Sequence, residues 1–407
     1  MRCGLLGQTL GHSYSPQIHG MLGNYDYELF EKEPQELEDF LKNGDFQGLN
    51  VTIPYKKSVI PFLNALSPTA QKLGAVNTIV RRKDGSLLGH NTDYFGFKSM
   101  LQESGLSVFG KKALVLGSGG AANTAVAVLE EAGAKVVVIS RNGENNYNNL
   151  HLHRDAAVIV NATPVGMYPN NGTSALSLDG FAHLEGVLDL IYNPARTKLL
   201  LDAENRGLVA ANGLWMLVAQ AKESSEWFQE TAIDDTQIRL IHRTLRSQME
   251  NIILIGMPGC GKSTVGKLIA QQTGRFFVDT DAEIVAMAQK SIPSIFAEDG
   301  EDIFRSYETQ VLADLGKKSG LIIATGGGCV TRQENYSHLH QNGTIVWLQR
   351  DIEDLPTEGR PLSASGKLDG MYRIRKPLYE AFADYQIANH TPQQATEEIL
   401  NLIGASL

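Results

Sequence analysis

Short, almost continuously apolar runs alternate along the chain with stretches of helical periodicity. Many of these runs end in Gly, Asn or Asp, and they read ALVLGSGG, KVVVISRN, AAVIVNATP, GVLDLIYNP, NIILIGMPG, RFFVDTD, GLIIATGGG and GTIVWLQR. Strands that are apolar throughout are typical of parallel sheets with helices on both faces. The pattern therefore predicts an α/β protein whose glycine-rich loops at the strand ends bind ligands.

The same pattern divides the chain into domains. Short, irregular strands such as GLNVTIP come first, and a regular series of strands and helices follows over residues 105–213. A mostly helical stretch from Leu214 to about Met249 precedes a fresh strand that starts at Asn251. We therefore predict three domains, which comprise residues 1–95 together with 214–248, residues 96–213, and residues 251–407.

Composition narrows the class of protein. The 407 residues suffice for two or three domains, and the contents of 43% apolar and 20% charged residues are those of a globular protein. The net charge of −9 argues against a general binder of nucleic acid or of an anionic membrane. No run approaches the roughly 18 apolar residues of a membrane span, and the first residues lack the apolar segment of a signal peptide. These features favour small-molecule substrates over nucleic-acid or membrane partners.

Cysteine usage points to a reducing compartment. The three cysteines, Cys3, Cys260 and Cys329, form neither a CxxC motif nor an even framework of pairs. Disulfide-stabilised secreted proteins carry such frameworks, whereas cytosolic proteins keep their thiols reduced. We therefore expect a cytoplasmic protein.

A glycine-rich turn follows a strand in KKALVLGSGGAANTAVAVLEEAGAKVVVISRN. Gly117, Gly119 and Gly120 would let the backbone approach a pyrophosphate at the start of the next helix. An ordinary strand–helix turn is the alternative, but the flanking strand and helix favour a Rossmann-type dinucleotide site. The second strand ends in Ser140 and Arg141 and not in an acidic residue. Because Arg can pair with a 2′-phosphate, NADP(H) is favoured over NAD.

Polar residues stand at unusual places in the first domain. They are Ser13 and Ser15 in GHSYSPQIHG, Thr52 and Lys56 in NVTIPYK, Asn77 in GAVNT and Asp93 in GHNTDYFG. Each alone has a structural explanation as a turn serine, a solvated lysine or a helix-capping aspartate.

Together these motifs resemble shikimate dehydrogenase over most of residues 1–245. The resemblance also rests on NTD, GSGGA, NATPVGM, DLIYNP and NGLWMLVAQA. It implies reduction of 3-dehydroshikimate by NADPH, with Lys56 and Asp93 as the catalytic pair. A Lys ammonium held by a carboxylate can polarise a keto oxygen and donate a proton to the forming alkoxide. The implied shikimate pocket comprises Ser13, Ser15, Thr52, Lys56, Asn77, Asp93, Tyr192 and Gln220. The implied NADP contacts are Gly117, Ser118, Gly119, Gly120, Ala121, Ser140, Arg141, Asn142, Asn161, Ala162, Thr163, Leu190 and Gly213.

A second nucleotide signal begins after the strand at Asn251. The stretch GMPGCGKS, Gly256 to Ser263, fits G-x-x-x-x-G-K-[ST] and opens a helix, which is the context that a P-loop requires. Backbone N–H groups would hold the β-phosphate, Lys262 would reach the β- and γ-oxygens, and Ser263 would bind Mg²⁺. A chance match in a glycine-rich turn is the alternative. Cys260 occupies a variable position, so we assign its thiol no chemistry.

Further residues after the P-loop narrow the acceptor. These are Asp279 and Asp281 in FFVDTD, Arg305 in EDIFRSYE, Gly326 to Gly328 in LIIATGGG, Arg360 in EGRPLSASGK and Arg375 in RIRKPLYEAFADY. Caps, turns and solvated arginines are the structural explanations. As a set they resemble shikimate kinase over roughly residues 250–400.

This second resemblance implies transfer of a phosphoryl group from ATP to shikimate. It assigns Lys262 and Asp281 as catalytic residues, and Asp281 would orient the 3-hydroxyl and could deprotonate it. Mg²⁺ would be held by Ser263, assisted by Asp279, and Arg360 would close over the γ-phosphate as part of a lid. Shikimate would contact Asp281, Arg305, Gly327 and Arg375. ATP would contact Gly259, Cys260, Gly261, Lys262, Ser263, Thr264 and Arg360.

The chain departs from both families at the rims of the nucleotide sites. Gly143, Glu144 and Asn145 follow Arg141 where NADP-specific members carry a second basic residue, and the stretch from Arg141 to Asn161 is shortened. The kinase lid in LQRDIEDLPTEGRPL is also short, and the usual basic residue before it is missing unless Arg350 substitutes.

The two resemblances together imply a bifunctional enzyme that acts twice at the same ring oxygen. The alternatives are a non-catalytic sensor of shikimate or quinate and an NAD-dependent quinate/shikimate dehydrogenase joined to a kinase. Retention of Lys56, Asp93, Lys262, Ser263 and Asp281 favours the enzyme over the sensor. Either a monomer or a homodimer is compatible with the sequence.

Overall fold

The computed structural model describes residues 1–11, 13–355 and 368–404. The chain forms two compact units, each of which is described by itself. The first comprises Met1–Met167, Gly172–Tyr192 and Leu199–His242, and the second comprises Tyr168–Asn171, Asn193–Lys198 and Arg243–Leu407.

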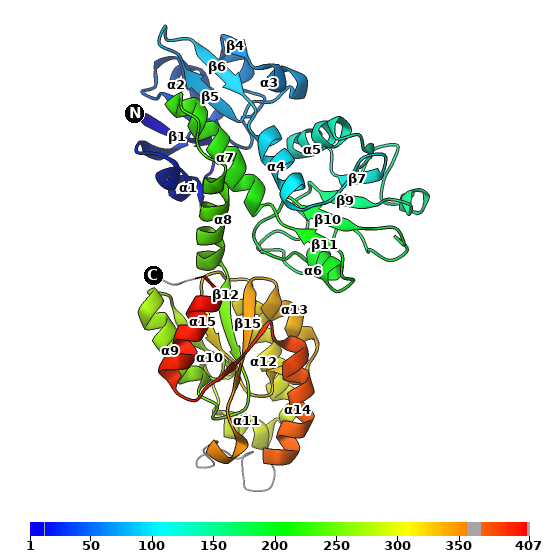
Figure 1. The fold of residues 1–407 in the computed structure, drawn as a ribbon, viewed down its shortest axis with the longest axis vertical. Coiled ribbons are helices and arrows are strands. Elements are labelled where there is room, and N and C mark those ends of the chain that lie inside the picture. The colour runs from blue at the N-terminus through cyan, green and yellow to red at the C-terminus, as the bar shows by residue number, and fades with distance from the viewer. Residues whose placement is uncertain (12, 356–367, 405–407) are drawn as a thin grey trace. The chain divides into compact units, whose positions relative to one another are not determined.

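The first sheet of the first unit has six strands in the order β2-β1-β3-β5-β6-β4 (Figure 1). It is mixed, because β5 runs antiparallel to β3 and to β6 whereas β1 pairs in parallel with β2 and β3. The strands are β1 (Arg2–Gly7), β2 (Asp26–Glu31), β3 (Gly48–Val51), β4 (Ala65–Leu66), β5 (Thr78–Arg81) and β6 (Leu87–His90). The helices around it are α1 (Ser15–Leu22), η1 (Pro34–Glu36), α2 (Leu37–Asn43), η2 (Ile60–Phe62) and α3 (Pro68–Leu73).

A helix from much later in the chain completes this part of the fold. Helix α7 (Leu214–Gln229) packs against β3 and β5 and is followed by α8 (Thr236–Met249). Gly48 in β3 leaves room for Phe228 of α7, since a Cβ at Gly48 would lie 2.2 Å from that ring. The side chains that pack between this sheet and α7 therefore come from distant parts of the sequence. The helical stretch that we predicted from Leu214 to Met249 is confirmed.

The second sheet of the first unit is fully parallel, in the order β11-β10-β9-β7-β8. Side chains of a strand point alternately to its two faces, and in β7 Ala113 and Val115 join one apolar core whereas Leu114 and Leu116 join another. Two covered faces explain the continuous apolar runs. The strands are β7 (Lys112–Leu116), β8 (Lys135–Ile139), β9 (Val158–Asn161), β10 (Gly186–Asp189) and β11 (Val209–Ala211). The helices are α4 (Asp93–Glu103), α5 (Gly120–Glu131), η3 (Leu150–His153) and α6 (Lys198–Glu204).

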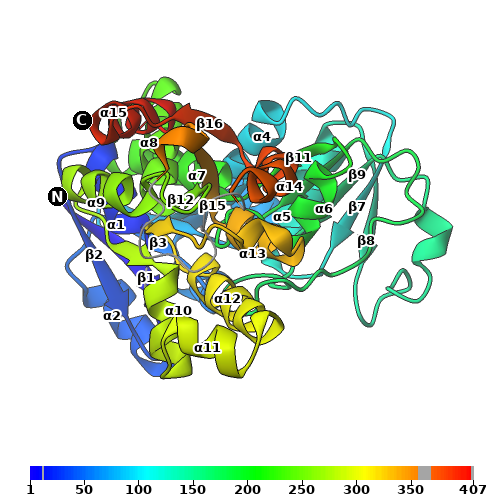
Figure 2. The same cartoon turned by 90° about the horizontal axis from the view of Figure 1, so that it is seen from below.

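The second unit contains a parallel sheet in the order β13-β14-β12-β15-β16. Its central strand β12 begins at Asn251, as predicted, and helices α10, α11 and α12 pack against one another beside the sheet (Figure 2). The strands are β12 (Asn251–Ile255), β13 (Phe277–Asp279), β14 (Ile322–Ala324), β15 (Gly343–Gln349) and β16 (Tyr385–Ala388). The helices are α9 (Lys262–Thr273), α10 (Thr280–Ala288), α11 (Ile292–Glu298), α12 (Glu301–Gly316), η4 (Cys329–Thr331), α13 (Glu334–His340), η5 (Ile352–Asp354), α14 (Leu368–Phe382) and α15 (Pro392–Leu402).

The predicted α/β class is confirmed, with two parallel sheets and one mixed sheet. The predicted domain boundary at residues 95 and 96 falls inside α4, so the three-domain division stays a prediction. Of the helices that the structure describes, none has both the length and the apolar character needed to cross a membrane.

Candidate functional site

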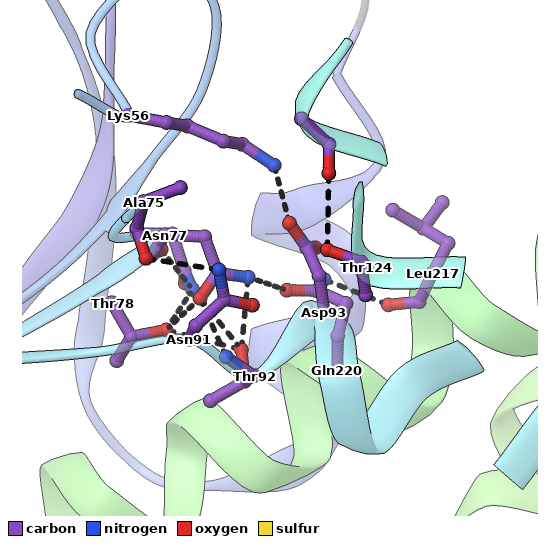
Figure 3. A network of polar contacts seen from close by, with 12 residues as sticks. Lys56, Ala75, Asn77, Thr78, Asn91, Thr92, Asp93, Thr124, Leu217 and Gln220 are labelled. Atoms are coloured by element: carbon purple, nitrogen blue, oxygen red, sulfur yellow. Dashed lines mark hydrogen bonds and ion pairs between the residues drawn. The ribbon is translucent and has the colours of Figure 1, made fainter. Parts of the chain in front are cut away.

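Lys56 and Asp93 form an ion pair in the first unit. Lys56 lies in the turn that follows β3, and Asp93 is the first residue of α4. The Lys56 Nζ lies 2.5 Å from Asp93 Oδ2, and the two side chains point toward one another (Figure 3). Their exposed fractions of 30% and 14% leave the pair accessible to a ligand. An ammonium held in this way can donate a proton to an oxygen placed beside it.

The segment around Ala75 connects the two halves of this pair. The backbone N–H of Val76 donates to Lys56 O at 2.7 Å, and Asn91 Nδ2 donates to Ala75 O at 3.0 Å. One short segment therefore contacts both the lysine's backbone and the residues just before Asp93. This arrangement brings together two side chains that are 37 residues apart in sequence.

Asn77, directly before β5, faces the same region. Its Oδ1 accepts the backbone N–H of Thr92 at 2.7 Å, which fixes the orientation of the amide. Its Nδ2 donates to Thr92 Oγ1 at 3.0 Å and lies 3.5 Å from Gln220 Oε1 (Figure 3). The structure thus brings Asn77 and Gln220 close to the start of α4, where Asp93 lies. Their membership of one substrate pocket stays a prediction.

Four other predicted pocket residues lie elsewhere in the same unit. Ser13 Oγ accepts the backbone N–H of Ser15 at 3.2 Å, where α1 begins, and Thr52 follows β3. Tyr192 meets Tyr14 edge to face, and burial raises the pKa of Tyr192, so its phenol stays a donor at neutral pH. Among the described residues, no hydrogen bond joins these four side chains to Lys56 or Asp93. Their membership of one pocket stays a prediction.

The predicted dinucleotide loop has the geometry of an open turn before a helix. Gly117 has a φ of +107°, and a Cβ there would lie 3.1 Å from Ala162 O, so glycine is required on both counts. By contrast, no atom lies within 4 Å of a Cβ built on Gly119 or Gly120. The backbone at the N-terminus of α5 is therefore accessible, which suits a pyrophosphate. Ser118 and Ala121 lie beside it, Ala121 being exposed.

The loops after β9 and β10 are held by a buried carboxylate. Asn161 Nδ2 donates to Asp189 Oδ1 at 2.9 Å, while its Oδ1 accepts Thr163 Oγ1 at 2.7 Å. Gly213 lies so close to Leu190 that a Cβ would be 2.1 Å from the carbonyl oxygen. Sequence reasoning did not single out Asp189, although an acidic residue at the end of an apolar strand was a signal for it.

Arg141 is exposed directly after β8, and Ser140 and Asn142 flank it. Residues 141–149 form turns and bends, and η3 is the one helical element in the described stretch between β8 and β9. Burial raises the pKa of Tyr147, and the charge of Arg141 offsets part of this rise.

The P-loop of the second unit joins β12 to α9. Gly256, Gly259 and Gly261 have φ values of +140°, +88° and +100°, a backbone conformation that favours glycine. The buried Lys262 donates from Nζ to Gly256 O at 2.9 Å and to Met257 O at 3.0 Å. The ammonium is thus positioned over the loop that would hold the phosphates. The buried Cys260 contributes backbone to this loop, and the exposed Thr264 lies in the first turn of α9.

Ser263 and Asp279 meet at the predicted magnesium position. Ser263 Oγ donates to Asp279 Oδ2 at 2.8 Å, and Asp279 Oδ1 accepts the backbone N–H of Asp281 at 3.1 Å. A hydroxyl and a carboxylate suit Mg²⁺, which prefers oxygen ligands and takes few from the protein itself. The residues present therefore fit the ion, and the cap at the start of α10 fixes the carboxylate.

Arg305 is buried between two carboxylates of α12. Its Nη1 donates to Glu308 Oε2 at 2.8 Å and its Nη2 to Glu301 Oε1 at 3.1 Å. Glu308 is fully buried; burial raises its pKa, and Arg305 offsets part of the rise. The motif EDIFRSYE contains Glu308, but sequence reasoning singled out only Arg305 in it. Its position one helical turn after Arg305 was the signal that could have found it.

Three consecutive glycines after β14, Gly326 to Gly328, each lie close to the side chain of a different residue. A Cβ would lie 2.8 Å from Glu308 Oε1 at Gly326, 2.7 Å from Pro258 Cδ at Gly327, and 2.2 Å from Arg305 Nη2 at Gly328. These glycines thus serve packing as well as the close approach to a ligand that we predicted. Arg375 of α14 donates to Gly327 O at 3.2 Å, which anchors the last predicted substrate arginine beside them.

A cavity of about 900 Å³ collects these groups in the second unit. Arg350 lines it, so a basic residue does stand before the predicted lid. Arg360 falls in residues 356–367, outside the described residues. Apolar side chains of α11 and α12 also line the cavity. The predicted residues that line the cavity are Gly259, Gly261, Lys262, Ser263, Thr264, Asp279, Asp281, Arg305, Gly327 and Arg375.

Comparison with known proteins finds a matching family model in each unit. Residues 5–79 match the family model of the shikimate dehydrogenase substrate binding domain, and residues 258–404 match that of shikimate kinase. The NADP(+) shikimate dehydrogenase of Clostridium perfringens (strain SM101 / Type A) is 37% identical over 265 residues, which cover 60% of this chain and 97% of that protein. The chain belongs to the shikimate dehydrogenase family. It also carries a shikimate kinase domain beyond the residues that this family covers.

Two solved structures support the family assignment. A chorismate mutase/shikimate 5-dehydrogenase fusion protein from Clostridium acetobutylicum is 38% identical, with a TM-score of 0.57 over 60% of this chain and 96% of that chain. The shikimate 5-dehydrogenase from Thermus thermophilus, in complex with NADP(H) and shikimate, is 31% identical, with a TM-score of 0.54 over 60% of this chain and 99% of that chain.

Proposed function

We propose that this protein catalyses two successive reactions at one ring oxygen. The first unit reduces 3-dehydroshikimate with NADPH and a proton, giving shikimate and NADP⁺. The second unit transfers the γ-phosphoryl group of ATP to the 3-hydroxyl of shikimate, giving shikimate 3-phosphate and ADP. The observation that carries the proposal is that one chain retains both the Lys56–Asp93 pair and the P-loop with Lys262, Ser263 and Asp279.

In the reduction, NADPH supplies the hydride, and the chain supplies the proton and the orientation. Lys56 donates a proton from Nζ to the oxygen at C3 as the alkoxide forms, and Asp93 holds the ammonium in place. Asn77 and Gln220 orient the ring hydroxyls through their amides. Ser13, Ser15, Thr52 and Tyr192 complete this pocket in our proposal.

In the phosphoryl transfer, Mg²⁺-bound ATP supplies the phosphoryl group, and the chain positions the acceptor and stabilises charge. Lys262 leaves the carbonyls of the P-loop to contact the β- and γ-phosphate oxygens. Asp281 orients the 3-hydroxyl of shikimate. Arg305 and Arg375 bind its carboxylate, for which the planar guanidinium is well suited.

Intact Lys56, Asp93, Lys262, Ser263 and Asp281 support an enzyme, and no observation supports the sensor. Arg141 at the end of β8, without an acidic residue beside it, supports NADP over NAD.

We further propose that the protein acts in the cytoplasm, as a monomer or homodimer, without nucleic-acid or membrane partners. Size-exclusion chromatography with light scattering would test the oligomeric state, and a nucleic-acid binding assay would test for that class of partner. Limited proteolysis would test the three predicted domains, 1–95 with 214–248, 96–213 and 251–407.

The decisive experiment measures both activities on the full chain. Purified protein should oxidise NADPH in the presence of 3-dehydroshikimate, with a clear preference over NADH, and should release ADP in the presence of shikimate. Lys56→Ala should lower only the first activity by roughly 10²-fold or more, and Lys262→Ala only the second to a similar extent. Lys57→Ala and Lys267→Ala remove exposed neighbouring lysines and serve as matched controls. Absence of both activities from the unmodified protein at saturating cofactor and Mg²⁺ would overturn the proposal.

A further inference from the structure

Three buried hydroxyl groups form a triangle beneath the reductive site. Thr78 Oγ1 lies 2.8 Å from Ser224 Oγ and 3.1 Å from Thr92 Oγ1, and the third side, from Thr92 Oγ1 to Ser224 Oγ, is 2.9 Å. The exposed fractions of Thr78, Thr92 and Ser224 are 0%, 2% and 0%. These side chains are therefore enclosed by protein and are not part of the surface that a substrate touches.

Each corner of the triangle is next to a residue that we assign to the substrate. Thr78, the first residue of β5, directly follows Asn77, and Thr92 directly precedes Asp93, the first residue of α4. Ser224 lies one helical turn after Gln220 in α7 and donates to Gln220 O at 2.9 Å. The triangle thus joins the three chain segments that carry Asn77, Asp93 and Gln220.

Donors and acceptors around the triangle are matched. Asn50 Nδ2 is a fixed donor to Ser224 Oγ at 2.8 Å, and Asn50 Oδ1 in turn accepts the hydroxyl of Tyr27 at 2.8 Å. Asn77 Nδ2 is a second fixed donor, to Thr92 Oγ1. The Gln220 carbonyl and the Oδ1 of Asn77 receive the outgoing hydrogens. A buried network that is satisfied in this way holds one arrangement of its members.

We propose that Ser224 is a positioning residue for the reduction of 3-dehydroshikimate, and that its hydroxyl sets Asn77 and Asp93 relative to Gln220. The proposal rests on the function proposed above. Ser224 reaches the other two corners from 146 and 132 residues away, so it is the one member that ties α7 to β5 and α4. Without its hydroxyl, Asn50 Nδ2 loses a buried acceptor, and α7 loses the polar contacts that Ser224 makes with Thr78 and Thr92. A displacement of the order of 1 Å at substrate-contacting groups is enough to slow a reaction substantially.

The neighbouring serine provides a matched control. Ser225 lies in the same helix, is equally buried, and makes two side-chain hydrogen bonds of its own, to Tyr25 and Gln229. Those bonds lead away from Asn77 and Asp93. Ser225→Ala therefore removes the same atom from the same helix without touching the triangle.

The test compares steady-state kinetics of full-length Ser224→Ala and Ser225→Ala, with the kinase activity of each preparation as an internal measure of folded protein. We expect Ser224→Ala to lower kcat/KM for 3-dehydroshikimate by roughly tenfold, as expected for loss of a buried hydrogen bond, while the KM for NADPH stays unchanged. Ser225→Ala should stay within about twofold of the unmodified protein, as a bond remote from the site should.

A second pair of variants covers the case in which Ser224→Ala does not fold. Thr78→Val removes the hydroxyl of another corner at similar size, and Thr78→Ser retains it. We expect Thr78→Val to reproduce the kinetic defect and Thr78→Ser to restore activity. Equal kinetic constants for Ser224→Ala and Ser225→Ala, or equal constants for Thr78→Val and Thr78→Ser, would overturn the proposal. If instead the unmodified protein lacked dehydrogenase activity, the proposed function would be wrong.

Discussion

The guanidinium group of Arg305 lies directly against the backbone of Gly328. A Cβ built on Gly328 would be 2.2 Å from Nη2 and 2.4 Å from Nη1 of that arginine. The φ of Gly328 is −104°, which other residues adopt readily, so space and not backbone conformation requires glycine here. The loop after β14 therefore limits where Arg305, which we predict to bind the substrate, can lie.

Replacement of Gly328 by alanine should therefore displace Arg305 while leaving the fold intact. We expect the KM for shikimate in the kinase reaction to rise ~10-fold or more, because a charge-assisted contact to the substrate is lost. Dehydrogenase activity of the same preparation should not change. Gly370→Ala is the control, since a Cβ there meets no atom within 4 Å. An unchanged KM for Gly328→Ala would show that Arg305 does not bind the substrate.

The two acidic partners of Arg305 should differ in importance because they differ in burial. Glu308→Gln removes the fully buried partner, and we expect it to raise the KM for shikimate by roughly tenfold, since Arg305 loses a charged hydrogen-bond acceptor away from water. Glu301→Gln removes a partner whose side chain is 60% exposed, so its effect should be about twofold or less. Steady-state kinetics at saturating MgATP distinguish the two. A larger effect from Glu301→Gln would contradict this ranking.

Cofactor preference should depend on Arg141. In Arg141→Ala, kcat/KM for NADPH should fall by roughly 10- to 100-fold, because a charged hydrogen bond to the 2′-phosphate is lost. The value for NADH should stay nearly constant, since that cofactor lacks the phosphate. Arg154→Ala removes an exposed positive charge from the same unit and serves as the control. If kcat/KM fell equally for NADPH and NADH, Arg141 would stabilise the loop and would not recognise the 2′-phosphate.

Acid should destabilise the first unit through its buried histidines. Burial lowers the pKa of His90 to about 4 and that of His19 to about 3, from an ordinary value near 6.5. Below pH 6.5 the unfolded chain therefore binds more protons than the folded chain, so the free energy of unfolding falls as the pH falls. Each histidine should contribute a slope of about 1.4 kcal/mol per pH unit between pH 6.5 and its folded pKa.

The measurement is a series of urea midpoints for the loss of dehydrogenase activity between pH 7 and pH 5. His90→Gln should flatten this dependence, whereas His183→Gln, at an exposed position, should leave it as it is. A His90→Gln variant with the full slope of the unmodified protein would show that this histidine is not the group that titrates.

Local chemistry explains why much of the site could be predicted. The P-loop signature specifies a strand, a turn and a helix within one short segment, so Lys262 and Ser263 were found where the structure has them. Arg141 and Gly117 were equally local, since each follows directly from the end of a strand. The continuous apolar runs predicted parallel sheets, because both faces of such strands are buried.

Other parts of the site depend on contacts that no local pattern encodes. The spacing of Glu308 and Arg305 in sequence is equally typical of an exposed helical ion pair, and the burial of Glu308 is what distinguishes it. The hydroxyl triangle joins residues that are 14, 132 and 146 positions apart, so sequence spacing carried no signal for it. The glycines after β14 were predicted to touch a ligand, whereas their protein neighbours could be known only from the packed loops.

The late arrival of α7 has a consequence for the making of the protein. Ser224 follows Thr92 by 132 residues, which at about 5–20 residues per second takes a ribosome roughly 7–26 s to synthesise. For that interval the chain has made Thr78, Thr92 and Gly48 of strand β3 but not the helix α7 that packs against them. We expect exposed apolar surface of the unfinished sheet to be open to chaperones during that interval. The kinase strand β12, which follows α8 almost directly, is synthesised only after that interval has ended.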